Sequence, residues 1–246
     1  MRKITIALDW TANTNHTGFY VALKKGFYKD LNIVIETTEM DNYTITPAKK
    51  VSLEMADVAL CPFESILSYR TIKAPFNAVA IATIFQEDIS AIASLESSNL
   101  KEPKDLDGCI YASYKARYED RIVQEVIRNN GGEGTVLLTY PEKLGIWNTL
   151  LEGKADATWI FKNWEGIRAK SEGVALNLFK MEDYGIPYGY SPVLMADKPL
   201  IAQYKTDYQN FLKATKRGYL FAQENPQEAV ACIAPFIATQ DKNIMI

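Results

Sequence analysis

The sequence predicts an α/β protein built as two similar lobes, and three observations support this fold class. Of its 246 residues, 48% are hydrophobic and 23% are charged, which is ordinary for a globular chain with ample material for a core. Short apolar and β-branched runs alternate with helical runs, as in a parallel or mixed sheet flanked by helices. The stretch from Leu53 to Val58 recurs loosely from Leu151 to Ala157, which suggests two similarly built lobes, with chance similarity as the alternative.

The first part of the chain alternates strands with helices. Thr17 is the expected N-cap of the first helix and Gly26 its end. Pro47 and Pro62 are each expected to open a helix, because proline is tolerated in a first turn. The apolar run at 78–84 resembles a strand that is covered on both faces. The expected strands are 4–8, 32–37, 57–60 and 78–84, and the expected helices are 19–25, 47–54 and 62–69.

The alternation starts again near residue 90. A helix at 119–129 is expected because its apolar residues fall on one face, and residues 129–132, Asn-Asn-Gly-Gly, should end it. The expected strands are 90–95, 109–112, 136–138, 157–161 and 190–195, with a further segment at 174–179, and the expected helices are 119–129, 142–151, 163–170, 205–223 and 226–235.

Charge and composition exclude several classes of function. The net charge is −3 and no basic run exists, so nucleic acid is not an expected partner. No stretch approaches the ~18 consecutive apolar residues of a membrane span. No signal peptide is visible, because the apolar run after the basic start ends at Asp9, so a cytosolic location is expected; a leader removed beforehand would instead imply a periplasmic or extracellular one. Cys61, Cys109 and Cys232 lie far apart and are expected to be small buried side chains rather than zinc ligands.

Polar and aromatic side chains gather directly after the expected strands. In open α/β sheets, ligands bind at the carboxyl ends of strands, beside helix N-termini whose N–H groups are unpaired. Rings, amides and carboxylates together suit a small, flat, polar heterocycle. The candidate ligand-binding residues are Asp9, Trp10, Asn13, His16, Thr17, Glu64, Ser65 and Gln86 in the first lobe, and Tyr111, Ser113, Tyr114, Asn163, Trp164, Glu165 and Tyr190 in the second.

Several of these candidates have a structural alternative. Asp9 could cap the following turn, Trp10 could pack at a domain edge, and His16 could be a satisfied structural histidine. Glu64 and Glu165 could be ordinary acids in a helix's first turn, where the dipole favours them. The chain has no GxSxG, GxxxxGK[ST], GxGxxG or HExxH motif, so neither catalytic nor metal-binding residues are predicted.

Residues 8–30, LDWTANTNHTGFYVALKKGFYKD, resemble the N-terminal signature of the thiamine-pyrimidine branch of the nitrate/sulfonate/taurine-type substrate-binding proteins. That branch includes bacterial binding proteins for pyrimidine precursors of thiamine and fungal pyrimidine precursor synthases. The likeness continues in order through ADVALCPFESILSYR, AVAIATIFQEDISAIAS, LEGKADATWIFKNWEGI and GYSPVLMA. It implies a two-lobed periplasmic-binding-protein fold of type II, with two hinge crossovers and a central cleft. The expected lobes are 1–86 with 194–246, and 87–193.

The resemblance also implies roles for individual residues. Residues 9–17 would form one wall of the cleft, with Trp10 as a stacking face. Asn163, Trp164 and Glu165 would form the facing wall, where Glu165 could accept hydrogen bonds from an aminopyrimidine edge.

Departures from the family pattern bear on catalysis. The fungal synthases carry a lysine that holds pyridoxal phosphate and a histidine four residues later, and these positions here hold Cys61 and Ser65. Their cysteine-rich iron-binding cluster is reduced to Cys232. We therefore expect a non-catalytic binder of a small thiamine-pyrimidine-like molecule, without cofactor, as a monomer or homodimer. The alternatives are a synthase-like enzyme, with Lys115 or Lys162 and His16 as substitutes, and a binder of a sulfonate or nitrate anion.

Overall fold

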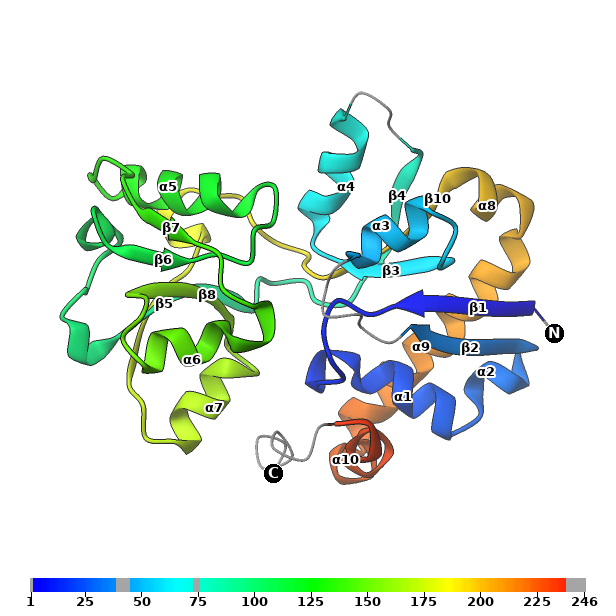
Figure 1. Cartoon of the computed structure of the whole chain (residues 1–246). Coiled ribbons are helices and arrows are strands. Elements are labelled where there is room, and N and C mark those ends of the chain that lie inside the picture. Colours follow the sequence, from blue (N-terminus) through cyan, green and yellow to red (C-terminus); the bar gives the residue numbers. More distant parts are fainter. Residues whose placement is uncertain (1, 39–44, 73–75, 238–246) are drawn as a thin grey trace. The chain divides into compact units, whose positions relative to one another are not determined.

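The computed structural model describes residues 2–38, 45–72 and 76–237, which belong to two compact units (Figure 1). Unit 1 consists of residues 1–86 and 190–246, and unit 2 of residues 87–189. The chain thus leaves unit 1 after Gln86 and returns after Gly189, four residues before the expected boundary at residue 193. Tyr190 already belongs to unit 1, where its N–H donates to Gln86 O at 3.3 Å.

Unit 1 contains a five-stranded mixed sheet. Its strands are β1 (Arg2–Ala7), β2 (Ile33–Thr38), β3 (Val58–Cys61), β4 (Ala78–Thr83) and β10 (Val193–Asp197). They lie in the order β2–β1–β3–β10–β4, where β1 is parallel to both neighbours and β10 is antiparallel to both of its own. The prediction that residues 78–84 form a strand covered on both faces is wrong, because β4 lies at the sheet edge and most of its side chains are partly exposed.

The described helices of unit 1 are α1 (Thr17–Lys24), α2 (Phe27–Asp30), α3 (Pro47–Ser52), α4 (Phe63–Thr71), α8 (Lys198–Gln203), α9 (Lys205–Glu224) and α10 (Pro226–Ile233). Thr17 is not the predicted N-cap: a 3-10 turn at Thr14–His16 runs directly into α1, and Thr17 Oγ1 donates to Thr14 O at 2.8 Å. Gly26 separates α1 from α2 with a left-handed φ of 76°. Within the described residues, no helix is long and apolar enough to cross a membrane.

Helices α1 and α9 cross at a pair of glycines. A Cβ on Gly218 would lie 2.0 Å from Gly18 O, and a Cβ on Gly18 would lie 2.2 Å from Tyr219 Cδ2. The close approach therefore requires glycine at both positions. It brings the Tyr219 ring edge-to-face against Phe19, with centroids 5.5 Å apart, and directs its hydroxyl to the loop before α1.

Unit 2 repeats the same strand topology. Its strands are β5 (Ser90–Leu95), β6 (Ile110–Ala112), β7 (Leu137–Thr139), β8 (Ala157–Phe161) and β9 (Leu176–Phe179), and its helices are α5 (Glu119–Asn129), α6 (Ile146–Leu151) and α7 (Glu165–Ser171). The order is β7–β6–β8–β5–β9, in which β6 is parallel to both neighbours and β5 antiparallel to both of its own. By this order β6 corresponds to β1, and the middle strand β8 corresponds to the middle strand β3.

The stretch that recurs at 53–58 and 151–157 forms the same turn in both units. Asp57 N donates to Thr5 O and Asp57 Oδ2 accepts from Thr5 N, both at 2.9 Å. Asp156 makes the same pair of bonds with Ile110, both at 2.8 Å. Three residues before each aspartate the backbone is left-handed, with φ of 58° and 68°. The recurrence therefore reflects equivalent structure rather than chance, because an aspartate just before β3 or β8 bonds to the neighbouring strand β1 or β6.

Candidate functional site

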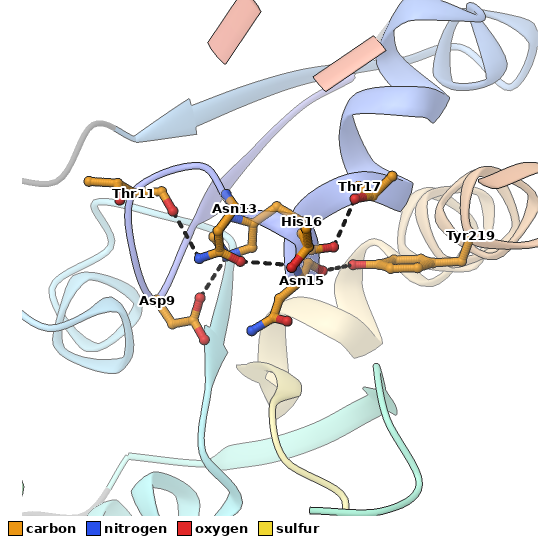
Figure 2. Close-up of polar contacts among 8 residues, drawn as sticks. Asp9, Thr11, Asn13, Asn15, His16, Thr17 and Tyr219 are labelled. Carbon is orange, nitrogen blue, oxygen red and sulfur yellow. Dashed lines mark hydrogen bonds and ion pairs between the residues drawn. The ribbon is translucent and has the colours of Figure 1, made fainter. Parts of the chain in front are cut away.

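The loop after β1 folds into a compact hydrogen-bonded turn before α1 begins (Figure 2). His16 is fully buried, and its Nε2 lies 2.7 Å from Asp9 Oδ1. Its Nδ1 accepts a hydrogen bond from Asn13 N at 3.3 Å. Because Nδ1 is an acceptor, the ring carries its proton on Nε2 and donates it to Asp9. The imidazole therefore fixes the Asp9 carboxylate close to the carboxyl end of β1.

Asn13 is the second anchor of this loop. Its Oδ1 accepts from Asn15 N at 2.8 Å, and its Nδ2 donates to Thr11 O at 3.0 Å. Tyr219, from α9, donates its hydroxyl to Asn15 O at 2.6 Å. The Asn13 and His16 side chains are thus turned inward and buried, where they hold the loop in shape.

Asp9 and Trp10 are partly accessible, as are Thr11, Ala12 and Thr14 in the same loop. The Asp9 side chain is 15% exposed although one oxygen is held by His16, and Trp10 is half-buried. A fixed carboxylate followed by an indole offers a hydrogen-bond acceptor next to an aromatic side chain. This pair is the part of the predicted site in unit 1 that has the chemistry to recognise a ring with amino groups.

The end of β3 adds polar groups beside the end of its parallel neighbour β1. Burial, and then the negative charge of Asp9, raise the pKa of the Cys61 thiol far above its ordinary value, while a hydrogen bond with Ser65 opposes this and the charge of Glu64 adds to it. Asp9, Glu64 and Ser65 therefore lie around the same buried thiol. The structure brings these three predicted residues together, as the sequence analysis expected.

The residues present do not fit pyridoxal phosphate. Cys61 is only 2% exposed, and neither its thiol nor the Ser65 hydroxyl can form the imine that the cofactor requires of a primary amine. Lys162 Nζ donates to a backbone oxygen at 3.1 Å, and Lys115 Nζ lies 5.4 Å from the centroid of the Tyr140 ring. Among the residues that the structure describes, no group of three or more His, Cys, Asp or Glu side chains could hold a metal ion.

Gln86 and Tyr190 mark the places where the chain leaves and re-enters unit 1. Both are exposed, Tyr190 to 59%, and Tyr190 has a left-handed φ of 53°. Their backbones are joined by the hydrogen bond described above. Their predicted role as ligand contacts stays a prediction.

In unit 2, the loop after β6 is organised around Glu119, the first residue of α5. Its Oε1 accepts from the Tyr111 hydroxyl at 3.0 Å and from Tyr114 N at 3.1 Å, and its Oε2 accepts from Ala116 N at 3.3 Å. Burial raises the pKa of Glu119 to about 7, although these hydrogen bonds lower it. Tyr111 thus packs its ring in the core of unit 2 and turns its hydroxyl to Glu119, while Tyr114 is half-buried.

Asp120 is a second carboxylate in the same loop region. Its Oδ1 accepts from Ser113 Oγ at 2.6 Å, and its Oδ2 accepts from the Tyr140 hydroxyl at 3.0 Å. Ser113 Oγ in turn accepts from Lys115 N at 2.9 Å. Ser113, predicted as a ligand contact, is buried and serves this network.

The loop after β8 contains the remaining candidates. Glu165 is buried, and its Oε2 accepts from Phe161 N at 2.9 Å. One carboxylate oxygen of this α7 residue thus bonds the last residue of β8. Trp164 is also buried and Asn163 is half-buried. The prediction that Glu165 meets an aminopyrimidine edge stays a prediction, as does that of a cleft lined by both lobes.

Three residues that shape these loops are not among the predicted site residues. Glu119 and Asp120 lie at the start of the expected helix at 119–129, and two acids in the first turn after a polar loop are a recognisable signal. Tyr219 lies within the expected helix at 205–223. The sequence signal for it is Gly18 with Gly218, and their contact appears only once α1 and α9 are packed.

Comparison with known proteins confirms the resemblance to thiamine-pyrimidine proteins. A family model described as "NMT1/THI5 like" matches residues 13–229. A protein named for thiamine biosynthesis from Haemophilus influenzae is 27% identical over 231 residues, covering 92% of this chain and 71% of the relative. A formylaminopyrimidine-binding protein from Halalkalibacterium halodurans is 25% identical over 237 residues, covering 94% and 69%. A 4-amino-5-hydroxymethyl-2-methylpyrimidine phosphate synthase from Legionella pneumophila is 22% identical over 234 residues, covering 92% and 71%.

Solved structures are similar over almost the whole chain. The alkanesulfonate-binding protein of Xanthomonas axonopodis pv. citri, solved with bound MOPS, superposes with a TM-score of 0.75 at 12% identity and covers 95% of this chain and 78% of that protein. At this identity the likeness shows the fold alone. It confirms the expected α/β class and the two-lobed fold of periplasmic binding proteins.

Proposed function

This chain belongs to the NMT1/THI5-like family, and we propose that it binds a small thiamine-pyrimidine-like heterocycle without changing it chemically. The observation that carries the proposal is the Asp9 carboxylate, which His16 Nε2 holds at 2.7 Å while the side chain stays 15% exposed. An aminopyrimidine edge presents N–H donors to such a carboxylate, and its ring face suits an aromatic neighbour such as Trp10. The relative named as a formylaminopyrimidine-binding protein supports this choice of ligand.

The same carboxylate argues against an anionic ligand. A sulfonate or nitrate ion at the end of β1 would meet the negative charges of Asp9 and Glu64, which both act on the buried Cys61 thiol. In a partly desolvated site, repulsion between like charges is much stronger than in water. The similarity to the alkanesulfonate-binding protein, at 12% identity, concerns the fold alone.

A panel of ligands tests the proposal. Thermal unfolding should be recorded with 4-amino-5-hydroxymethyl-2-methylpyrimidine, a formylaminopyrimidine, thiamine, an alkanesulfonate and nitrate. A ligand that binds only the native state stabilises it by about 2.7 kcal/mol at a hundredfold excess over Kd. We expect saturable stabilisation by the aminopyrimidines and none by the two anions. Stabilisation by the anions alone would contradict the proposal.

Asp9→Asn tests the residue that carries the argument. The asparagine oxygen can still accept from His16, so the loop should keep its shape while the negative charge is lost. Because a hydrogen bond to a charged group contributes about 1.5–3 kcal/mol, we expect affinity for the aminopyrimidine to fall roughly 10- to 100-fold. Asp30→Asn is the matched control, since Asp30 forms only an exposed ion pair with Arg217. Equal affinities for both variants would remove Asp9 from the site.

Trp10→Ala tests the aromatic neighbour. We expect loss of ligand-induced stabilisation while the ligand-free protein keeps its circular dichroism spectrum and its unfolding midpoint. An unfolded Trp10→Ala protein would instead make Trp10 a packing residue.

Glu165→Gln tests the predicted contact in unit 2. The amide oxygen can still accept from Phe161 N, so the strand end should be preserved. Under our proposal the variant weakens binding of the aminopyrimidines, because the amide that replaces the carboxylate carries no negative charge. Unchanged affinity for the aminopyrimidines would remove the proposed edge contact.

A synthase-like enzyme is the second candidate, because one relative is named as a synthase. Uptake of pyridoxal phosphate would give the purified protein a stable near-visible absorption band. We expect no such band, since Cys61 and Ser65 supply no amine. A band that persists through gel filtration would favour the enzyme.

Two further properties belong to this proposal and need direct measurement. We propose a cytosolic location, whereas solved proteins of this fold include a periplasmic sulfonate-binding protein; fractionation of the source cells decides between the two compartments. Light scattering after gel filtration distinguishes a monomer from a homodimer.

A further inference from the structure

The N-terminus of α5 is the place in unit 2 where an anion would be expected to bind. A helix N-terminus carries unpaired N–H groups and partial positive charge, and a preceding loop with a left-handed residue directs further N–H groups to the same point. Here α5 is 11 residues long, and Lys115 in the preceding loop has a left-handed φ of 60°. The backbone therefore offers the donors of an anion site.

The donors of this loop are already used by the protein itself. Tyr114 N at 3.1 Å, Ala116 N at 3.3 Å and the Tyr111 hydroxyl at 3.0 Å all donate to the carboxylate of Glu119. Glu119 is only 3% exposed, so its carboxylate is enclosed by these groups rather than shared with solvent. Two backbone N–H groups and a tyrosine are the kind of donors that would hold the oxygens of an external anion.

We propose that Glu119 is an internal anion that occupies the anion-binding position before α5 and thereby excludes sulfonate, nitrate and phosphate from this loop. Glu119 is thus a specificity-determining residue, because it occupies the N–H groups of Tyr114 and Ala116 that an anionic ligand in this loop would need. Its meaning for ligand choice rests on the proposed function, whereas the occupation of the loop by Glu119 stands by itself.

A neighbouring carboxylate acts in the same direction. Asp120 lies beside Glu119 and is held by Ser113 and Tyr140, so an entering anion would meet two carboxylates. The charge of Lys143 interacts with Glu119 and opposes this repulsion, and burial lowers the pKa of the Lys143 ammonium group. Burial raises the pKa of Glu119 to about 7, with a smaller contribution from the charge of Asp120.

Glu119→Ala opens the occupied position and gives a direct test. The substitution leaves the Tyr111 hydroxyl and two N–H groups without their acceptor, around a space the size of a carboxylate. We expect formate and nitrate, which have the same planar shape, to raise the unfolding midpoint of Glu119→Ala in a saturable way. Wild type and Glu125→Ala should show no saturable shift, because Glu125 is exposed on the same helix.

Three outcomes decide the proposal. Saturable rescue by formate, with an apparent affinity at least tenfold above that of wild type, supports it. If Glu119→Ala does not fold in chloride, folding in 0.5 M formate supports it equally, and failure in both salts contradicts it. A folded Glu119→Ala protein that responds to formate no more than Glu125→Ala also contradicts it. The formate experiment uses no pyrimidine, so its result does not depend on the proposed function. If formate rescues Glu119→Ala but the wild-type protein binds no pyrimidine, only the proposed function is contradicted.

Discussion

The two units share one strand order, yet the loops after the equivalent strands β1 and β6 are built from different groups. In unit 1, β1 leads into a loop held by amide and imidazole groups, and its carboxylate, Asp9, remains partly accessible. In unit 2, β6 leads into a loop whose central group is the buried carboxylate of Glu119. The two loops thus hold equivalent places in one topology, and they differ in that the carboxylate of Glu119 is buried whereas that of Asp9 is partly accessible.

The loops also differ in what supports them. In unit 2 the donors to Glu119 come from β6 and the residues just before α5, within eight positions of it. In unit 1 the loop is tied to α9 by Tyr219, which is 204 residues away from Asn15. The first loop therefore depends on the packing of distant helices, whereas the second depends on local contacts.

Gly218→Ala should have the largest effect on stability, because a Cβ there would lie 2.0 Å from the backbone oxygen of Gly18. The crossing of α1 and α9 would have to open, and we expect the free energy of unfolding to fall by about 3 kcal/mol or more. Urea unfolding measures the loss. Gly166→Ala in unit 2 is the control, because the nearest neighbour of its Cβ would be 3.7 Å away. Equal stability of the two variants would show that the tether from α9 does not hold unit 1.

Glu119→Gln tests how the buried carboxyl group in unit 2 makes stability depend on pH. The pKa of Glu119 is raised from 4.5 to about 7 in the folded state, which therefore binds this proton more tightly than the unfolded chain does. The resulting stability is fully present below pH 4.5 and is lost as the pH rises through 7. At 1.36 kcal/mol per unit, wild type should lose about 3 kcal/mol relative to Glu119→Gln across this range.

Urea unfolding of both proteins at pH 5, 6, 7 and 8 checks this expectation. Glu125→Gln, on the exposed side of α5, should give a difference from wild type that stays constant. If the difference in the free energy of unfolding between Glu119→Gln and wild type also stays constant from pH 5 to 8, Glu119 is ionised over this whole range.

His16→Ala tests the organising residue of the unit 1 loop. It leaves Asp9 Oδ1 and Asn13 N without the partners described above, and losing such buried bonds costs about 2 kcal/mol. We expect this loss in urea unfolding, together with loss of aminopyrimidine binding in calorimetry. His16→Gln can still donate to Asp9 and should recover binding more than stability. Full binding by His16→Ala would show that Asp9 needs no fixed orientation.

Tyr219→Phe and Tyr111→Phe compare one hydrogen bond in each unit. Tyr219→Phe removes the bond to Asn15 O and should cost about 1 kcal/mol, whereas Tyr111→Phe removes a bond to a carboxylate and should cost about 1.5–3 kcal/mol at pH 8. Urea unfolding of both variants at this pH resolves the difference. A larger loss for Tyr219→Phe would reverse the order expected from charge.

Sequence patterns predict the fold best where local signals are complete. Residues 119–129 and 157–161 are predicted to the residue, because an amphipathic period and an apolar run define them. The edge position of β4 is not predictable in this way, since its neighbour β10 comes from the far side of unit 2 in the sequence. Helices α2 and α8 are missed because four and six residues are too few to show a helical period.

The site is predictable in composition and not in orientation. The stretch from Asp9 to Thr17 is recognisable by its amides, ring and acid as a polar loop after a strand. Its sequence does not show that Asn13 and His16 turn inward, because their orientation follows from hydrogen bonds that exist only in the folded loop. Sequence alone therefore identifies the loop, and the packed structure shows that Asn13 and His16 are buried while Asp9 stays partly accessible.

Isothermal titration calorimetry of the wild-type protein shows directly whether it binds an aminopyrimidine or a sulfonate. A formylaminopyrimidine and an alkanesulfonate should be titrated separately at the same pH and ionic strength. We predict saturable one-site binding of the pyrimidine, weakened in Asp9→Asn, and no binding heat with the sulfonate. Saturable binding of the sulfonate with none of the pyrimidine would contradict this account.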